Sequence, residues 1–289
     1  MEKVISTPGK TREILQKFNL QPNKALGQNF LIDNNILNKI IKAGEVTKKD
    51  HVIEIGPGIG SLTQRLAEMA GKVTVIEKDR RLIPVLKEIL HMYDNINYIE
   101  DDVLKVDWSK IIGPGEKIKV IANLPYYITT PIIMGLLENC LPVDIMVFMV
   151  QKEVAERMVA EPGGKDYGAL SIAVQFYSKA EIVAIVPPTV FIPRPKVNSA
   201  IIKLTRLEKP AVDVLSEEIF FKVVKASFQQ RRKTLGNSLS RSSELPLSKV
   251  EIKEALKVAG IDPSLRGEKL RIEDFGRLSD EIYQRIQQK

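Results

Sequence analysis

VIEIGPGIGSLT, residues 52–63, runs from an apolar strand pattern through a glycine-rich turn into the start of a helix. Gly56, Gly58 and Gly60 allow the backbone to turn sharply and to approach a ligand closely. Alone the string is a weak signal, because similar glycine patterns occur by chance. Its position between a strand pattern and a helix pattern strengthens it. We therefore expect the first strand–turn–helix unit of an α/β fold, with a cofactor bound at the turn.

Strand and helix patterns alternate on both sides of this turn. The strand patterns cover residues 51–56, 72–77, 96–100, 119–124 and 144–151, and two of the helix patterns cover 61–71 and 80–93. This alternation predicts a parallel sheet with helices on both faces. In the first helix pattern, Leu62, Leu66 and Met69 share one face. We expect residues 174–187 and 199–207 to form later, partly antiparallel strands.

The composition changes after about residue 207, where strand patterns stop. Three helix patterns follow, over residues 216–241, 247–260 and 272–288. We therefore predict a Rossmann-like α/β domain over residues 1–207 and a small all-helical domain over residues 208–289. Within the first domain, residues 1–25 read as an N-terminal extension, a short helix followed by a loop.

The charge and the rare residue types restrict the function. The 289-residue chain carries 43 Lys and Arg against 36 Asp and Glu, a formal net charge of +7. This balance favours an acidic partner such as nucleic acid, although charge also serves solubility. The chain has only one cysteine, Cys140, and two histidines, His51 and His91. These low counts argue against disulfides, zinc sites and histidine-dependent triads. We expect no bound metal ion. We expect Cys140 to be a small buried apolar residue and not a nucleophile.

Targeting and membrane signals are not evident in the sequence. The N-terminal stretch MEKVISTPGKTREIL lacks the apolar core of a secretory signal, and charged and proline residues interrupt the most apolar later stretch. We expect a cytoplasmic protein without membrane association. No sequence feature requires a dimer, so we expect a monomer.

Acidic residues near the strand ends indicate which cofactor the turn binds. Glu77 ends the strand pattern after the turn, where an acid accepts hydrogen bonds from two ribose hydroxyls. A solvated strand end is the alternative. Together with Glu54 and Asp101, this acid would repel a pyrophosphate and suits a sulfonium cation, which favours S-adenosylmethionine. Asp102 is then placed to accept from the cofactor's adenine amino group, unless it is only a helix cap or turn acid.

The stretch NLPYYITTPI, residues 123–132, suits a reaction at an adenine amino group. That nitrogen is a poor nucleophile, because its lone pair is delocalised into the ring. Hydrogen-bond acceptors for its N–H groups localise the lone pair, and the Asn123 side chain and the Leu124 backbone carbonyl can supply them. Pro125 fixes the turn, and Tyr126 offers a face on which the target base can stack. Taken singly, Tyr126 would be an ordinary core aromatic.

These motifs belong to a longer series that resembles the small-subunit ribosomal RNA adenine dimethyltransferase family. The matching stretches occur in order at residues 24–33, 54–63, 75–79, 101–104, 123–132, 149–158, 166–172, 190–201, 227–239 and 260–275. The resemblance implies a class I methyltransferase fold with a small all-helical C-terminal domain, and S-adenosylmethionine as cofactor. It implies N6,N6-dimethylation of two adjacent adenosines in the 3′-terminal hairpin of 16S rRNA. It also implies the 30S subunit or its precursor as substrate and a role in 30S biogenesis.

The resemblance assigns residues that local reasoning leaves open. It places Asn29 and Leu31 at the cofactor, and Phe191 against the other face of the target base from Tyr126. The expected cofactor-binding set is Asn29, Leu31, Gly56, Gly58, Glu77, Asp102 and Asn123. The expected catalytic set is Asn123, Leu124, Pro125, Tyr126 and Phe191.

A one-signed run of charge predicts the RNA contacts. Between Ile219 and Ser243 there are six basic residues and no acid, with a compact patch, QQRRKT, at 229–234 that we expect on a helix. Such patches bind phosphates without reading sequence, although a solvated helix face is the common alternative. The expected RNA-binding residues are Lys222, Lys225, Arg231, Arg232 and Lys233, together with Arg194 and Lys196 for phosphates beside the target base.

Two other functions remain open. Macrolide-resistance methyltransferases, which modify a 23S rRNA adenosine, usually carry NIPY and a lysine in the glycine turn. This chain has NLPY and GPGIG instead. A non-catalytic ribosome assembly factor on the same scaffold is the second alternative. Intact Asn123, Pro125 and Tyr126 argue against lost chemistry.

Overall fold

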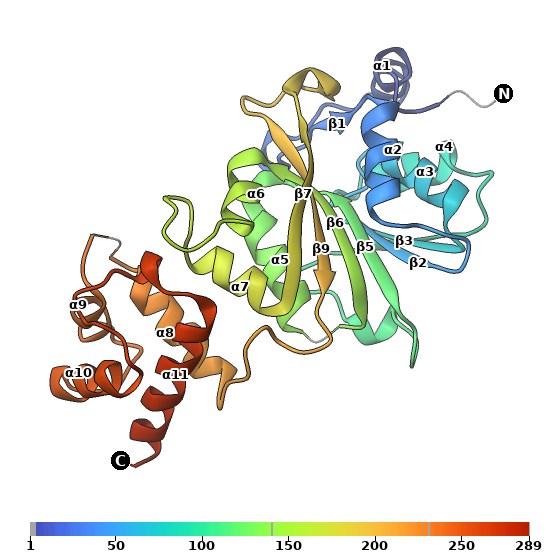
Figure 1. The fold of residues 1–289 in the computed structure, drawn as a ribbon. Helices are drawn as coiled ribbons and strands as arrows, with labels where there is room; N and C mark the ends of the chain where they lie inside the picture. Colours follow the sequence, from blue (N-terminus) through green and yellow to red (C-terminus); the bar gives the residue numbers. More distant parts are fainter. Residues whose placement is uncertain (1–3, 140, 231, 289) are drawn as a thin grey trace. The chain divides into compact units, whose positions relative to one another are not determined.

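The computed structural model describes residues 4–139, 141–230 and 232–288 (Figure 1). The chain divides into two units, of which the first comprises Met1–Ala155 and Ala180–Arg206 and the second Glu156–Lys179 and Leu207–Lys289. The chain passes for the last time from the first unit to the second between Arg206 and Leu207, close to where the composition changes. Residues 156–179 cluster with the C-terminal helices, although the sequence pattern placed them in the first domain. Cys140 lies outside the described residues.

A seven-stranded sheet forms the centre of the first unit. Its order is β4-β3-β2-β5-β6-β9-β7, and Figure 1 shows its strands side by side. Pairing is parallel from β4 through β6, and β9 is antiparallel to β6. The α/β class, the parallel sheet and its antiparallel end are therefore confirmed. The strands are β2 (His51–Ile55), β3 (Lys72–Glu77), β4 (Ile96–Glu100), β5 (Ile118–Asn123), β6 (Val143–Gln151), β7 (Ser178–Val186) and β9 (Ser199–Arg206).

The strand order places a crevice beside β2. From β2 the chain adds β3 and β4 on one side and then β5 and β6 on the other. Ligands of open α/β sheets bind outside the carboxyl ends of the strands where the order reverses in this way. The central strands are mostly apolar, and every residue of β2 is buried. Burial of both faces favours such runs, because helices cover a parallel sheet on both sides.

Helices cover the sheet through apolar faces that the sequence spaces at helical intervals. The covering helices of the first unit are α2 (Asn34–Ala43), α3 (Ser61–Met69), α4 (Leu82–Ile89) and α5 (Thr129–Glu138). Leu37 and Leu66 pack in one core cluster with Val52 and Val147 of the sheet. Leu62 is buried as expected, but Met69 is 40% exposed. The helix ends at Met69, and the next residue, Ala70, is buried in the core instead of the Met69 side chain.

The N-terminal segment is ordered against the glycine turn. It forms α1 (Pro8–Lys17) and a short strand β1 (Phe30–Leu31), which pairs antiparallel with β8 (Phe191–Ile192). Ile5 and Ile14 pack in a cluster that includes Ile59, next to the turn. The Ile5 amide also donates to Gln64 Oε1 of α3 at 3.0 Å. The expected short helix followed by a loop is confirmed, and it is anchored beside the cofactor crevice.

The second unit is helical. Its helices are α7 (Ala169–Tyr177), α8 (Glu217–Phe228), α9 (Leu235–Leu239), α10 (Lys249–Val258) and α11 (Ile272–Gln287), while α6 (Lys152–Met158) crosses the division between units. The rings of Phe176 and Phe220 pack against each other in the core, with centroids 4.7 Å apart and an interplanar angle of 32°. The Tyr167 hydroxyl donates to the Leu270 carbonyl at 3.0 Å. These contacts join α7 and the turn before it to the C-terminal helices.

Two sequence expectations for this region are wrong. Residues 174–177 belong to the end of α7 and not to a strand, which begins only at Ser178. Val174, Phe176 and Tyr177 favour strands intrinsically, but all three are buried in helical conformation. The pattern over 216–241 is also interrupted, because α8 ends at Phe228 and α9 begins at Leu235.

The interruption moves the positive patch off a helix. The described residues of QQRRKT lie in the connection between α8 and α9. The first amides of α9 are held from outside the helix: Leu235 N donates to Leu265 O at 2.7 Å and Gly236 N to Pro263 O at 3.1 Å. The 260–266 segment therefore sets where α9 starts. Across the described ranges, no helix has both the length and the apolar character that crossing a membrane requires.

Candidate active site

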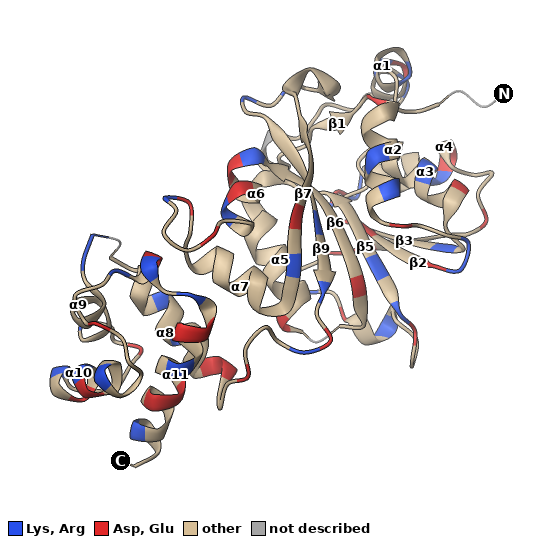
Figure 2. Cartoon of the chain, in the orientation of Figure 1, with Lys and Arg blue, Asp and Glu red and all other residues tan. Residues whose placement is uncertain are grey.

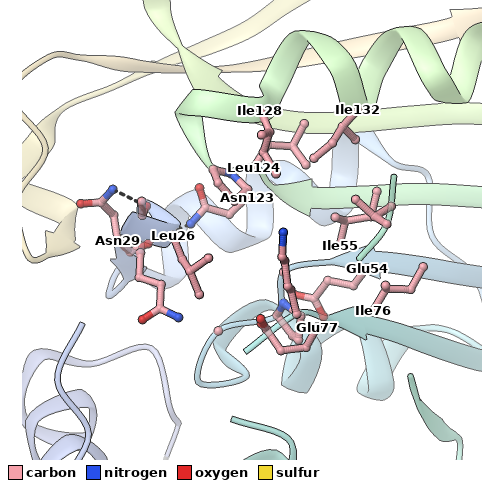
Figure 3. Close-up of a pocket in the computed structure, with 18 of the residues that line it drawn as sticks. Leu26, Asn29, Glu54, Ile55, Ile76, Glu77, Asn123, Leu124, Ile128 and Ile132 are labelled. Atoms are coloured by element: carbon pink, nitrogen blue, oxygen red, sulfur yellow. Dashed lines mark hydrogen bonds between the residues drawn. The ribbon is translucent and has the colours of Figure 1, made fainter. Parts of the chain in front are cut away.

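A pocket opens at the carboxyl ends of β2, β3 and β5. It measures about 980 Å³ including its mouth. Figure 3 shows Asn29, Asn123 and Leu124 on one side of this space and Glu54 and Glu77 on the other. The sequence-predicted residues that line the pocket are Asn29, Leu31, Gly56, Gly58, Glu77, Asp102, Asn123, Leu124, Pro125 and Tyr126. Residues from five separate stretches of sequence therefore meet at one site.

The glycine turn has the backbone that the sequence suggested. Gly56, Gly58 and Gly60 have φ of +67°, +59° and +87°, in the left-handed region that side chains other than glycine disfavour. Space also matters at Gly58, where an added Cβ would lie 3.0 Å from the Phe30 ring. Gly58 therefore lets β1 lie directly against the turn. Gly56 is different, because a Cβ there meets no atom within 4 Å.

Two buried carboxyl groups form the floor of the pocket. Glu54 on β2 is 1% exposed, and its Oε2 has no hydrogen-bond partner among the described residues. Burial raises the pKa of Glu54 to about 8, against a lowering influence of the Thr63 hydroxyl. Glu77 at the end of β3 is 6% exposed and accepts from the Asp79 amide at 2.8 Å. Burial raises the pKa of Glu77 to about 7. A cation or hydroxyl groups entering the pocket would stabilise the ionised carboxylates.

Asp102 has partners for both of its carboxylate oxygens. Oδ2 accepts from Lys78 Nζ at 2.8 Å, and Oδ1 accepts from the Leu104 amide at 3.1 Å. The hydrogen bond from Lys78 lowers the pKa of Asp102. The turn-acid alternative considered from sequence is thus realised, while the side chain also lines the pocket. Sequence reasoning missed Lys78, whose only signal is its place between Glu77 and Asp79.

The Asn123 amide is oriented by its neighbour on the N-terminal segment. Asn123 Nδ2 donates to the Asn29 carbonyl at 3.0 Å, and Asn29 Nδ2 donates to the Gly27 carbonyl at 2.9 Å. Because its nitrogen is engaged, the Asn123 amide presents Oδ1 as an acceptor. The turn beyond it is held by the Pro125 carbonyl, which accepts from Thr129 Oγ1 at 3.1 Å. An oriented acceptor therefore lies at the pocket beside a fixed turn.

Of the two expected stacking aromatics, Tyr126 lines the pocket and Phe191 does not. Tyr126 lies in a short 3₁₀ turn, η3 (Tyr126–Ile128), and its hydroxyl is 2.6 Å from Ser199 Oγ. Phe191 is 1% exposed, packs in the core cluster with Leu31, and is not among the pocket-lining residues. Stacking by Phe191 would require its ring to leave that core. Sequence reasoning missed Tyr127, which is 53% exposed and does line the pocket.

The expected RNA-binding residues fall into separate groups. Arg194 and Lys196 are exposed on the connection between β8 and β9. Lys222 pairs with Glu218 at 2.5 Å, and Lys225 pairs with Glu244. Both acids lie just outside the acid-free run.

The described residues of QQRRKT make the more open group. Arg232 and Lys233 are exposed, whereas Arg231 lies outside the described residues. Figure 2 shows blue on the connection between α8 and α9, and both signs of charge on α10.

The donor set of the pocket suits an organic cofactor. Within the described ranges, no group of three or more His, Cys, Asp or Glu side chains could hold a metal ion. What the pocket offers is a left-handed glycine turn, buried carboxyl groups, an oriented amide and an aromatic face. Such a site can bind a cationic nucleoside and place an amino group against it, with water largely excluded.

Comparisons with known proteins agree with this chemistry. A family model described as ribosomal RNA adenine dimethylase matches residues 19–284. A relative from Halothermothrix orenii, named ribosomal RNA small subunit methyltransferase A, is 54% identical and covers 99% of this chain and 96% of its own. A relative of the same name from Bacillus pumilus is 54% identical, covering 97% of this chain and 98% of its own.

Solved structures show the same fold. A dimethyladenosine transferase from Plasmodium falciparum is 30% identical with a TM-score of 0.71, covering 86% of this chain and 95% of its own. The 23S rRNA methyltransferase ErmE is 29% identical with a TM-score of 0.66, covering 88% of this chain and 100% of its own. The Rossmann-like methyltransferase fold is thereby confirmed.

Proposed function

Because this chain belongs to the ribosomal RNA adenine dimethylase family and is an rRNA adenine methyltransferase, we propose a specific reaction for it. It dimethylates N6 of two adjacent adenosines in the 3′-terminal hairpin of 16S rRNA, within the 30S subunit or its precursor. Relatives named for the small subunit, at 54% identity over nearly the whole chain, support this substrate. The single observation that carries the chemistry is the oriented amide of Asn123 at the mouth of a pocket floored by Glu54 and Glu77.

S-adenosylmethionine, the cofactor of this methyltransferase class, supplies a methyl group on a sulfonium and so the driving force for transfer. The proposed contacts are those of the pocket. Glu77 binds the ribose hydroxyls, and the left-handed turn at Gly56 and Gly58 allows close backbone approach. Asp102 accepts from the adenine amino group by sharing an oxygen that Lys78 now occupies. Asn29 and Leu31 cover the cofactor from the N-terminal segment.

The target adenine is activated by acceptors and held by stacking. Asn123 Oδ1 and the Leu124 carbonyl accept from the N6 amino group, which turns the nitrogen lone pair toward the methyl group. Tyr126 presents its ring to the flipped base. The N6 nitrogen becomes cationic when it takes the methyl group and then readily loses its proton to solvent, so no strong base is needed. Positioning and the exclusion of water around the reacting groups supply the rate. We propose that Phe191 stacks on the face of the target base opposite Tyr126. To do so, its ring must leave the core in which it is now buried.

The helical unit is proposed to bind RNA phosphates. Its support is the exposed pair Arg232 and Lys233 in the connection before α9. Lys222 and Lys225 contribute less, because each is paired with a glutamate. Arg194 and Lys196 extend this contact from the first unit. We propose a cytoplasmic monomer that uses no metal, and a further role in 30S biogenesis.

One observation favours a second candidate. The structural likeness to ErmE, with a TM-score of 0.66, is near that to the dimethyladenosine transferase. A large-subunit adenosine is therefore the rival substrate. Membership of a methyltransferase family argues against a scaffold that binds the small subunit without methylating it.

A labelled methyl-transfer assay separates these functions. Undermethylated 30S subunits, 50S subunits and duplex DNA are offered in parallel with labelled cofactor. Label in 30S alone is the expected result. Label in 50S would support the resistance-type function, and tight 30S binding without label would support the scaffold.

A further inference from the structure

We propose that Ser199 is a positioning residue for the target adenine and acts through Tyr126. The inference rests on the proposed function, because it assumes that the Tyr126 ring stacks on the base. The Tyr126 hydroxyl and Ser199 Oγ lie 2.6 Å apart, although 73 residues separate them in sequence. The sequence around either residue does not predict this contact.

Ser199 offers a rigid mounting point. It is fully buried and is the first residue of β9, directly opposite Gln151 at the end of β6. The pairing continues with Ala200 opposite Val150, and the Lys152 amide donates to the Asn198 carbonyl at 3.0 Å. The backbone that carries the hydroxyl is therefore held by the sheet itself.

Tyr126 lies in a short turn rather than in the sheet, and its side chain is only partly buried. It follows Pro125 in the three-residue turn η3, and its ring lines the pocket. Removal of the hydroxyl contact would give the ring more freedom to change its χ angles, because an aromatic side chain has several staggered orientations and this contact selects one of them. Ser199 thus fixes at its far end the face that Tyr126 presents. Small errors in such placement are costly for transfer between two bound reactants.

The second methyl transfer depends most on this placement. The unmodified amino group has two N–H bonds that Asn123 and Leu124 can both accept. After the first transfer one N–H is replaced by a methyl group, so one hydrogen bond is lost and stacking must orient the nitrogen. A loosened ring should therefore raise the share of N6-monomethyladenosine more than it slows the first transfer.

The experiment is a double-mutant cycle of Ser199→Ala and Tyr126→Phe, with mono- and dimethyladenosine quantified by mass after single turnover on undermethylated 30S subunits. Both single variants should slow the second transfer about fivefold to tenfold, the effect of losing one buried hydrogen bond. The double variant should be no slower than either single variant, because both remove the same contact. Cofactor affinity, measured by calorimetry, should stay unchanged.

Ser178→Ala is the matched control. Ser178 is also a buried serine at the first residue of a strand in this sheet, and its hydroxyl donates to the Val174 carbonyl at 2.8 Å. Its removal should lower the melting temperature without changing the product ratio. A Ser199→Ala enzyme with the wild-type ratio, or additive effects in the cycle, would overturn the inference. Wild-type enzyme that dimethylates nothing would instead overturn the proposed function.

Discussion

The Asn123 side chain uses its nitrogen for an internal hydrogen bond and keeps its oxygen free to bind a ligand. Its nitrogen donates to the Asn29 carbonyl at 3.0 Å, which leaves the oxygen for substrate. The sequence predicted the acceptor from chemistry alone. It could not predict the orienting partner, because Asn29 lies 94 positions away and was assigned to the pocket only through resemblance.

Asn123→Ala should lower the rate of methyl transfer by about 10²–10³-fold, the typical cost of removing one oriented hydrogen-bonding group from an active site. Single-turnover methylation of 30S subunits measures this rate. Particle binding should stay largely intact, because the residue lies in the pocket and not among the exposed basic residues. Retained turnover would refute the acceptor role.

Glu54 should make the stability of the ligand-free protein depend on pH. Burial raises its pKa from the ordinary value of 4.5 to about 8, so the folded state binds more protons than the unfolded state between these values. The resulting stabilisation is complete below pH 4.5 and is lost as the pH rises through about 8. Glu77, whose pKa is raised to about 7, acts in the same direction.

Melting temperatures of wild type and Glu54→Gln between pH 5 and 8.5 test this sign. The wild type should lose stability with rising pH more steeply than the variant, whose amide does not titrate. Equal slopes for the two proteins would mean that Glu54 does not titrate in this range.

The glycine turn is the element that joins fold to site. Gly58→Ala should destabilise the fold by about 1–2 kcal/mol, the cost of a side chain in the left-handed region. The added Cβ would also displace Phe30, which lies 3.0 Å away, so cofactor affinity should fall as well. Calorimetric titration with S-adenosylhomocysteine measures that affinity.

Gly115→Ala provides the control for backbone strain. Gly115 has φ of +73° but no atom within 4 Å of an added Cβ. It should lose similar stability and keep its cofactor affinity. If both variants bound cofactor equally well, contact between β1 and the turn would have no part in the site.

The connection between α8 and α9 is the element proposed to hold phosphates. Replacement of Arg231, Arg232 and Lys233 by alanine should weaken particle binding and flatten its salt dependence, because fewer counterions are released. Replacement of Lys222 and Lys225 should change the slope less, since Glu218 and Glu244 already pair with them. Binding measured over a range of salt concentrations gives both slopes, and an unchanged slope for the triple variant would leave the connection as a solvated surface.

Elements were predictable where one physical signal dominated. β3 runs from Lys72 to Glu77, as its apolar pattern predicted, because burial on both faces requires that pattern. The end of α7 was not, because Phe176 and Tyr177 favour strands locally and are helical only through packing against Phe220 and Phe221. The pairing of Lys78 with Asp102 likewise depends on the meeting of two strand ends.

At the scale of the whole molecule, the sequence predicted a methyltransferase domain followed by a helical domain. The change in composition near residue 207 indicated where the chain finally enters the second unit, since strand patterns stop there. It could not indicate that residues 156–179 cluster with the later helices, because their apolar residues suit either core. The reaction proposed for the molecule needs both parts, one for the chemistry and one for the RNA.

The most direct test of that reaction maps the modified nucleosides. Undermethylated 30S subunits are incubated with enzyme and cofactor, and fragments of their RNA are sequenced by mass. The predicted result is N6,N6-dimethyladenosine at two adjacent positions in the 3′-terminal hairpin. Methyl groups elsewhere in the RNA, or one monomethylated adenosine as the final product, would contradict the account.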